Sequence, residues 1–256
     1  MADLRLRAKE VVRKLLPSTP RPHRIRGGAL KGARLYTSWH DYPGAILGTT
    51  ERPLLEWFAD NVRPGETWID IGAHYGYTAI ALARLVGQSG RVFAFEPVPC
   101  TANCIERTRD LNSLAQITVV PLGLDDGPNQ RTRDLSIVRG MADSTVGLTA
   151  TPGRIRTASL DSIWPTLCGD RAYVHGIKID VQGMELAVVR GMDRLLQTWS
   201  PMLIVEFHRG VDRGEIFRVL KRSGYGTAWT PIDQESPCNV FADDMSYVFR
   251  KVPCAS

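Results

Sequence analysis

The chain has 256 residues, of which 43% are hydrophobic and 23% are charged. This balance is typical of an ordinary globular protein, and it excludes collagen-like, disordered and membrane-spanning chains. The longest apolar stretch, residues 78–86, is interrupted by Arg84 and is far shorter than the ~20 residues that a bilayer requires. A chain of this length can bury a large core, so it needs neither a disulfide nor a metal ion for stability.

The net charge is +5, from 32 basic and 27 acidic residues. The basic residues form no run of the kind that marks a nucleic-acid-binding arm, so we do not expect a nucleic-acid partner. The five cysteines have no zinc-site spacing, and no signal peptide is visible. We therefore expect free thiols and a cytoplasmic location.

The N-terminal segment 3–16 has apolar residues at helical spacing with basic residues between them, and a proline-rich linker follows to Pro22. Such a basic helix can contact a membrane surface or an anionic carrier, but we favour docking on its own domain or on a partner subunit. Peripheral membrane contact and a homodimer therefore stay open. We divide the chain into this helix and linker (1–22), N-terminal strands and a helix that pack on the core (23–62), and the main domain (63–256).

Strands and helices alternate through the main domain. The expected strands lie at 68–71, 91–95, 117–120, 177–180 and 202–206, and the expected helices at 77–86, 100–111, 184–196 and 215–223; a further helix at 54–62 precedes this domain. This alternation predicts an α/β fold in which helices cover both faces of a parallel sheet. Strands at 226–230 and 246–252 have only a loop between them, so they pair antiparallel. The outline is a Rossmann-like class I methyltransferase fold, with a mostly parallel seven-stranded sheet and an antiparallel C-terminal strand.

A glycine turn follows the first strand of the main domain. Gly72 can adopt a backbone conformation that a side chain forbids, and Gly76 opens a helix whose free N–H groups suit a carboxylate or a phosphate. The G-x-G-x-x-G order of dinucleotide sites is absent, and Asp70 at the strand end would crowd a pyrophosphate. Both points disfavour a nicotinamide-dependent oxidoreductase.

An acidic residue, Glu96, ends the next strand, 26 positions after Asp70. This is the position at which Rossmann-like folds bind a ribose diol. The alternative is a solvated strand end.

Several motifs occur in the order found in the FkbM family of S-adenosylmethionine-dependent methyltransferases, and the chain resembles that family over roughly residues 45–250. They are Asp70-Ile-Gly-Ala-His-Tyr-Gly-Tyr-Thr78, Ala94-Phe-Glu96-Pro97, Ser159-Leu-Asp161, Ile177-Lys-Ile-Asp180-Val-Gln-Gly183-Met-Glu185, Arg190-Gly191 and the segment from Pro201 to His208. The resemblance implies a Rossmann-like fold with bound S-adenosylmethionine. It also implies O-methylation of a sugar, polyketide or other small metabolite, or in some members N-methylation of a peptide.

The resemblance also implies a cofactor site. Asp70 and Gly72 would hold the amino-acid part, Glu96 the ribose, and residues 122–125 would border the adenine. The full set implied for the cofactor is Glu51, Asp70, Gly72, Ala73, His74, Gly76, Glu96, Pro97, Leu122, Gly123 and Asp125. The chain departs from the family at His74, where Asn is usual, and at Gln182, where Glu is usual.

Catalytic candidates gather at the ends of the strands at 177–180 and 202–206. Lys178 and Asp180 are two positions apart, so both leave the same face of their strand, and His208 follows the next strand. His208 is the preferred base because its ordinary pKa lies near 6.5. Asp180 would orient the acceptor or act as the base, and Lys178 would keep Asp180 ionised or, less favourably, act as the base.

Glu185 and Glu206 are the substrate-binding candidates at this edge. Two structural alternatives remain open, namely a hydrogen-bonded structural role for His208 and a buried ion pair between Lys178 and Glu185. Asp180, Glu185, Glu206 and His208 could in principle bind a divalent cation, but their spacing is not compact and we predict no metal site.

The long connection from Asp126 to Tyr173 is expected to cover the acceptor pocket and to set its specificity. Met141, Ser144, Thr145 and Val146 lie in it, and Trp39, His40 and Tyr42 are candidates for another wall. The sequence thus predicts an S-adenosylmethionine-dependent methyltransferase for a hydroxyl group of a small metabolite, glycan or glycolipid. N-methylation of a peptide or amide, and a non-catalytic Rossmann-like binding module, are the alternatives.

Overall fold

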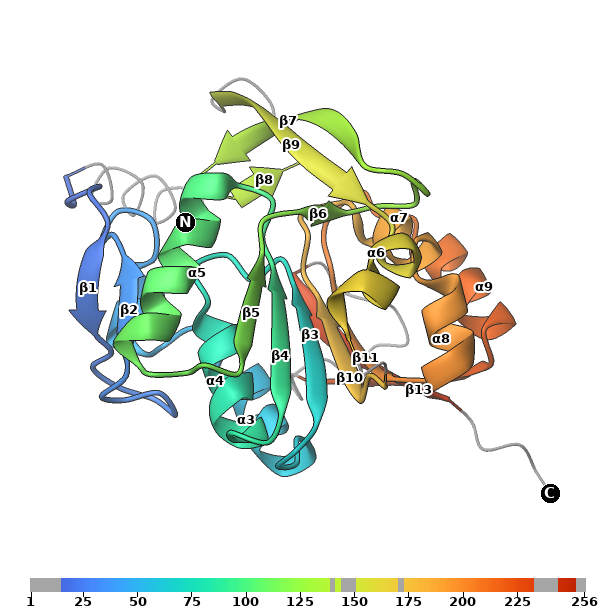
Figure 1. Cartoon of the computed structure of the whole chain (residues 1–256), viewed down its shortest axis with the longest axis horizontal. Coiled ribbons are helices and arrows are strands. Elements are labelled where there is room, and N and C mark those ends of the chain that lie inside the picture. The colour runs from blue at the N-terminus through green and yellow to red at the C-terminus, as the bar shows by residue number, and fades with distance from the viewer. Residues whose placement is uncertain (1–14, 139–140, 144–150, 170–172, 233–243, 252–256) are drawn as a thin grey trace, which may run out of the picture.

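The central sheet of the computed structural model has seven strands in the order β12-β13-β11-β10-β3-β4-β5 (Figure 1). The structure describes residues 15–138, 141–143, 151–169, 173–232 and 244–251. The strands of this sheet are β3 (Thr67–Ile71), β4 (Arg91–Phe95), β5 (Ile117–Val120), β10 (Gly176–Ile179), β11 (Met202–Phe207), β12 (Tyr225–Pro231) and β13 (Met245–Lys251). Only β13 runs against its neighbours in this sheet, which confirms the predicted mostly parallel sheet with an antiparallel C-terminal strand.

Helices cover both faces of the sheet because its buried strands present apolar side chains on alternate sides. Trp68 packs on one side with α3 (Arg52–Asn61), α4 (Tyr77–Val86) and α5 (Pro99–Leu111). Ile69 and Ile71 pack on the other side with the remaining helices. These are α6 (Leu160–Leu167), α7 (Glu185–Arg190), α8 (Asp193–Trp199) and α9 (Arg213–Arg222). The site therefore has a rigid two-sided scaffold.

The N-terminal segment forms the hairpin of β1 (Arg21–Arg24) and β2 (Arg34–Thr37), followed by α2 (Pro43–Leu47). The hairpin lies beside α5, where the backbone N–H of Tyr36 donates to Thr108 Oγ1 at 2.9 Å. Strand β1 begins inside the segment that we expected to be a linker through Pro22. The helix expected at 3–16 lies outside the described residues except for its last two positions.

The connection from Asp126 to Tyr173, which we expected to cover the acceptor pocket, contains strands and a helix. It forms β7 (Arg131–Val138), β8 (Met141–Asp143), β9 (Thr151–Ala158) and α6, and the strands join β6 (Gly123–Leu124) in a second sheet of order β6-β9-β7-β8. This sheet lies above the carboxyl ends of β3, β4 and β5 (Figure 1). Ser144, Thr145 and Val146 lie outside the described residues.

The single helix expected at 184–196 is also wrong, because two helices occupy this region. Helix α7 ends before Gly191, where a side chain would collide with the carbonyl oxygen of Asp125. Helix α8 then starts anew, since the Asp161 carboxylate accepts the backbone N–H groups of Arg194 and Leu195 at 2.8 and 2.9 Å. A distant residue thus sets this boundary.

Cys100, Cys104 and Cys168 carry free thiols. Within the described ranges, none of the helices combines the length and the apolar character needed to cross a membrane.

Candidate cofactor and acceptor site

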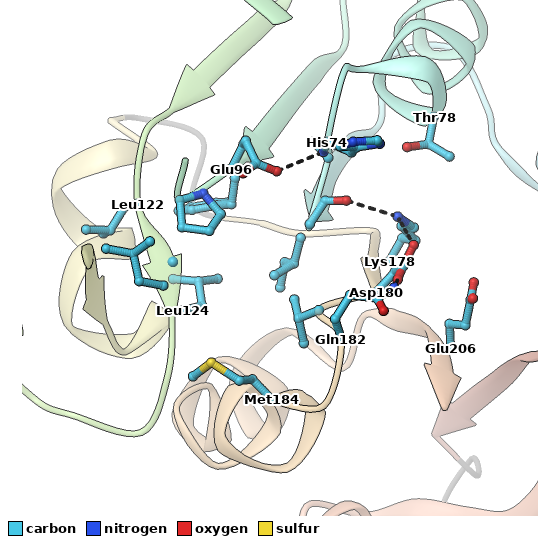
Figure 2. Close-up of a pocket in the computed structure, with 18 of the residues that line it drawn as sticks. His74, Thr78, Glu96, Leu122, Leu124, Lys178, Asp180, Gln182, Met184 and Glu206 are labelled. Atoms are coloured by element: carbon cyan, nitrogen blue, oxygen red, sulfur yellow. Dashed lines mark hydrogen bonds and ion pairs between the residues drawn. The ribbon is translucent and has the colours of Figure 1, made fainter. Parts of the chain in front are cut away.

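A cavity of about 260 Å³ lies at the carboxyl ends of β3, β4, β10 and β11. Most of the predicted site residues line it, namely Glu51, Gly72, Ala73, His74, Glu96, Pro97, Leu122, Gly123, Lys178, Asp180 and Glu206. Its apolar side carries Leu122, Leu124 and Met184, and its acidic side carries Asp180 and Glu206 (Figure 2). The five predicted residues that do not line it are Asp70, Gly76, Asp125, Glu185 and His208.

The glycine turn after β3 lies against β10. Gly72 has a φ of 80°, and a Cβ there would collide with the carbonyl oxygen of Asp180. His74 also has a left-handed backbone, with φ of 49°, which is uncommon for a residue other than glycine. The turn therefore places successive backbone groups along the cavity wall. Gly76, also left-handed, caps α4 behind this wall.

Glu96 ties the end of β4 to this turn. Its Oε2 accepts the backbone N–H of His74 at 3.0 Å, and its Oε1 accepts that of Val98 at 2.9 Å. Burial raises the pKa of the Glu96 carboxyl to about 8, although both hydrogen bonds favour the ionised form. A carboxylate can accept further bonds, so Glu96 is suited to a ribose diol.

Asp125, expected to border the adenine, has a different environment. Its carboxylate accepts bonds from Arg131, Arg133 and Thr157 at 2.6–2.7 Å. Burial opposes ionisation, but these hydrogen bonds, first that of Arg131, hold the pKa of Asp125 down at about 2. The side chain therefore anchors the second sheet. The apolar wall nearby is formed by Leu122 and Leu124 from the predicted segment 122–125, together with Ile155, which sequence reasoning missed.

Lys178 lies between two carboxylates in the wall of the cavity. Its Nζ is 3.4 Å from Asp70 Oδ1 and 3.2 Å from Asp180 Oδ2, with 3% of the side chain exposed. Burial would lower the pKa of Lys178, but Asp180 and then Asp70 outweigh it and raise the pKa. Lys178 therefore stays protonated and is unsuited to act as a base. The open alternative of a Lys178–Glu185 pair does not form, since Glu185 contacts His208 instead.

Asp70 is fully buried behind the cavity wall. Its Oδ2 accepts the hydroxyl of Thr78 at 2.6 Å, and Thr78 itself lines the cavity. Asp70 thus supports Thr78 and Lys178.

His208 joins the acidic end of the site. Its Nδ1 lies 2.6 Å from Glu185 Oε1, and its Nε2 lies 3.5 Å from Asp180 Oδ1 and 3.6 Å from Glu206 Oε1. Burial lowers the pKa of His208, but the bond to Glu185 and the neighbouring carboxylates raise it to about 9. The charge of Asp180 and then burial raise the pKa of Glu206 to about 8. His208 therefore carries a proton at pH 7 in this arrangement, whereas our preference for it as the base depended on a pKa near 6.5.

Of the expected aromatic wall, only Tyr42 lines the cavity, next to Asp41. Trp39 lies under Arg26, and His40 bonds Asp41. Gln182 was missed as a site residue. The signal in the sequence was its departure from the family pattern, and the structure adds that Gln182 lines the cavity with a left-handed backbone, at φ of 51°.

A mostly parallel sheet with one reversed C-terminal strand, and a glycine turn tied to an acid on the adjacent strand, define the fold of class I S-adenosylmethionine-dependent methyltransferases. The model of the Methyltransferase FkbM domain matches residues 70–226, which is more than half of the chain. The chain belongs to this family. The family match and the fold confirm the predicted family, the predicted fold and S-adenosylmethionine as the cofactor.

The chain is also similar to several known proteins. The hexuronic acid methyltransferase AglP of Haloferax volcanii is 27% identical over 188 residues, which are 72% of this chain and 74% of that protein. The crystal structure of an FkbM methyltransferase from Methylobacillus flagellatus KT is 18% identical with a TM-score of 0.49; the match covers 81% of this chain, which spans about half (52%) of that one. Aeropyrum pernix fibrillarin, solved with natively bound S-adenosyl-L-methionine, is 13% identical with a TM-score of 0.49, covering 90% of this chain and 87% of that chain.

Proposed function

We propose that this protein transfers a methyl group from S-adenosylmethionine to a hydroxyl group of a sugar or a similar polyhydroxylated small molecule. The observation that carries the proposal is the order of groups along one cavity. An apolar end is followed by a carboxylate that is suited to a ribose, and then by a cluster of carboxylates with a histidine.

The cavity has the donors and acceptors that this cofactor needs. Leu122 and Leu124 would contact the adenine, and Glu96 would accept hydrogen bonds from the ribose hydroxyls. Glu51 lines the same cavity, where its carboxylate suits the cationic amino-acid part. Burial and then the charge of Asp180 raise the pKa of Glu51, so a nearby cation would favour its ionised form.

The cofactor supplies an electrophilic methyl group on a sulfonium, which is already a good leaving group. The chain's main task is therefore to hold the acceptor oxygen in line with that methyl group, and such alignment can contribute about 7–11 kcal/mol. Asp180 and Glu206 are placed to accept hydrogen bonds from acceptor hydroxyls. Glu185 acts as a positioning residue, because its carboxylate fixes the ring of His208 at 2.6 Å.

Two facts support a polyhydroxylated acceptor. The similar protein AglP is named for methylation of a hexuronic acid, which is a sugar derivative. The acceptor end of the cavity holds carboxylates from Asp180 and Glu206, which pair well with hydroxyl groups and repel an acidic group close to the reacting oxygen.

The test uses the full chain and methyl-labelled S-adenosylmethionine with a panel of neutral sugars, hexuronic acids, their lipid-linked forms, and peptides. We expect a methyl ether on a sugar hydroxyl, identified by mass spectrometry of the product. Transfer only to a peptide nitrogen, or to the carboxyl group of a hexuronic acid, would contradict the proposed acceptor. Absence of S-adenosylmethionine binding in a parallel calorimetric titration would contradict the proposed activity.

A further inference from the structure

We propose that Asp180, Glu206 and His208 bind a divalent metal ion next to the reacting oxygen of the acceptor. One ligand atom from each of these residues lies within 4.8 Å of the others. The role of the ion in methyl transfer rests on the proposed function. The existence of the site does not, because it follows from how the three side chains are held.

Each of the three side chains has two polar atoms. One of them contacts a residue outside the cluster, and the other faces the remaining two side chains of the cluster. Asp180 directs Oδ2 to Lys178 at 3.2 Å, and its Oδ1 faces His208. Glu206 directs Oε2 to the hydroxyl of Ser246 at 3.4 Å, and its Oε1 faces His208.

His208 follows the same rule. Its Nδ1 is bound to Glu185, whose side chain is fully buried, so Nε2 is the atom that can bind an ion once the ion displaces its proton. Histidines that bind metal ions almost always donate their other ring N–H to a carboxylate or a carbonyl group. Lys178, Ser246 and Glu185 are therefore the outer groups that orient the three ligands.

The separations fit a shared cation. Two ligands that each lie roughly 2.1 Å from a metal ion are ~3.0 Å apart at a right angle and ~3.6 Å apart at 120°. The Nε2 atom of His208 is 3.5 Å from Asp180 Oδ1 and 3.6 Å from Glu206 Oε1. Both values correspond to bond angles common in metal centres, and a cation would draw the two mutually repelling carboxylates together.

The amide group of Gln182 contacts two of the proposed ligands, His208 and Asp180, at the place where a cation would bind. Its Nε2 lies 2.7 Å from His208 Nε2 and 3.5 Å from Asp180 Oδ1. This NH₂ group donates to Asp180 and, when the His208 ring is neutral, also to Nε2, so it acts as a weak substitute for a cation. Rotation of this side chain would free the two ligand atoms and could bring its own carbonyl oxygen to the ion.

Two carboxylates and one imidazole suit a first-row divalent cation such as Mn²⁺. A hydroxyl group bound to such an ion loses its proton more readily. In the methyl transfer, the O–H bond of the acceptor hydroxyl breaks and its proton passes to solvent. The oxygen then bonds to the methyl carbon, and the C–S electron pair stays on sulfur. With the ion bound, His208 is a ligand and needs no role as a free base.

The test is calorimetric titration of MnCl₂ into the full chain after treatment with a chelator and desalting. Paramagnetic resonance of free Mn²⁺ gives the stoichiometry, and S-adenosylmethionine is titrated into the same samples. We expect one Mn²⁺ per chain. Asp180→Asn should weaken binding at least about tenfold, and Glu185→Gln, which removes an outer group, by roughly 10–100-fold. Gln182→Glu adds a carboxylate and should tighten binding, a gain that misfolding cannot produce.

The matched control is Glu56→Gln, which removes one negative charge from a side chain that is 63% exposed on α3. This control should leave Mn²⁺ affinity unchanged. If Mn²⁺ does not bind while S-adenosylmethionine does, the metal site is wrong and the proposed function stands. An equal loss in Asp180→Asn and Glu56→Gln would also overturn the site. If Mn²⁺ binds with the expected order of variants but no methyl group is transferred, the proposed function fails and the metal site stands.

Discussion

The carboxylate of Glu96 accepts the backbone N–H of His74 at 3.0 Å, which joins the end of β4 to the glycine turn that follows β3. The same carboxylate accepts the N–H of Val98 at 2.9 Å and lines the cavity (Figure 2). Two backbone donors thus fix its orientation before any ligand arrives. A carboxylate held in this way can bind a diol without first losing side-chain freedom.

At pH 9, where the Glu96 carboxyl is mostly ionised, Glu96→Gln should weaken S-adenosylmethionine binding by about 10–100-fold. The amide keeps the shape, but it removes the charge that strengthens hydrogen bonds from ribose hydroxyls, and each such bond is worth about 1.5–3 kcal/mol. Isothermal titration calorimetry measures the effect. Glu106→Gln, an exposed carboxyl group on α5, is the control and should bind as the original chain does. Equal affinities in the original chain and both variants would mean that Glu96 does not contact the cofactor.

The affinity for S-adenosylmethionine should rise with pH around the pKa of Glu96, which burial places at about 8. Only the ionised carboxylate accepts from two hydroxyls, and roughly a tenth of it is ionised at pH 7 against nine-tenths at pH 9. The expected gain is therefore about tenfold, measured by titration at both pH values. The stability of the cofactor-free fold should change in the opposite direction. A raised carboxyl pKa makes that fold less stable as pH increases. Glu96→Gln should lose the part of the pH effect that comes from this group, and the same slope in both proteins would count against the assignment.

The sequence predicted the central sheet well because its strands are short apolar runs between clear turn signals. Helix α4 (Tyr77–Val86) and strand β4 (Arg91–Phe95) have the predicted bounds. The second sheet was missed because β7 and β9 pair across a long connection, from Arg131 with Thr157 to Ile137 with Thr151. Pairing of this kind depends on distant partners, which local patterns do not reveal.

The site shows the same difference between local motifs, which the sequence reveals, and contacts between distant residues, which it does not. Gly72 and Glu96 were found because a motif of adjacent residues marks each of them. The sequence predicted that Asp180, Glu206 and His208 gather at neighbouring strand ends, but distances between side chains of different elements are seen only in the structure, where one ligand atom of each lies within 4.8 Å of the others. The pKa of His208 was wrongly assigned its ordinary value for the same reason, because Glu185 reaches it from another element.

Lys178→Met should destabilise the fold by about 3–5 kcal/mol, since removing one partner of a buried ion pair leaves an uncompensated charge. Here both Asp70 and Asp180 lose their cation, and Asp70 is fully buried. Urea denaturation followed by circular dichroism measures the free energy of unfolding. Lys221→Met, at an exposed position on α9, should change it little. A similar small loss in both variants would mean that Lys178 contributes little to stability.

Asp125→Asn separates the structural role of this residue from the cofactor contact that the family resemblance implied. The Asp125 carboxylate accepts from Arg131, Arg133 and Thr157, which hold its pKa at about 2. A depressed carboxyl pKa stabilises the fold above its ordinary value near 3.9, and this contribution is lost as the pH falls from about 4 to 2. The variant should therefore melt several degrees lower at pH 7, and the difference should shrink towards pH 2. S-adenosylmethionine affinity at pH 7 should stay within about twofold, because the side chain does not line the cavity. Unchanged melting with a large loss of affinity would reverse the assignment and make Asp125 a cofactor ligand.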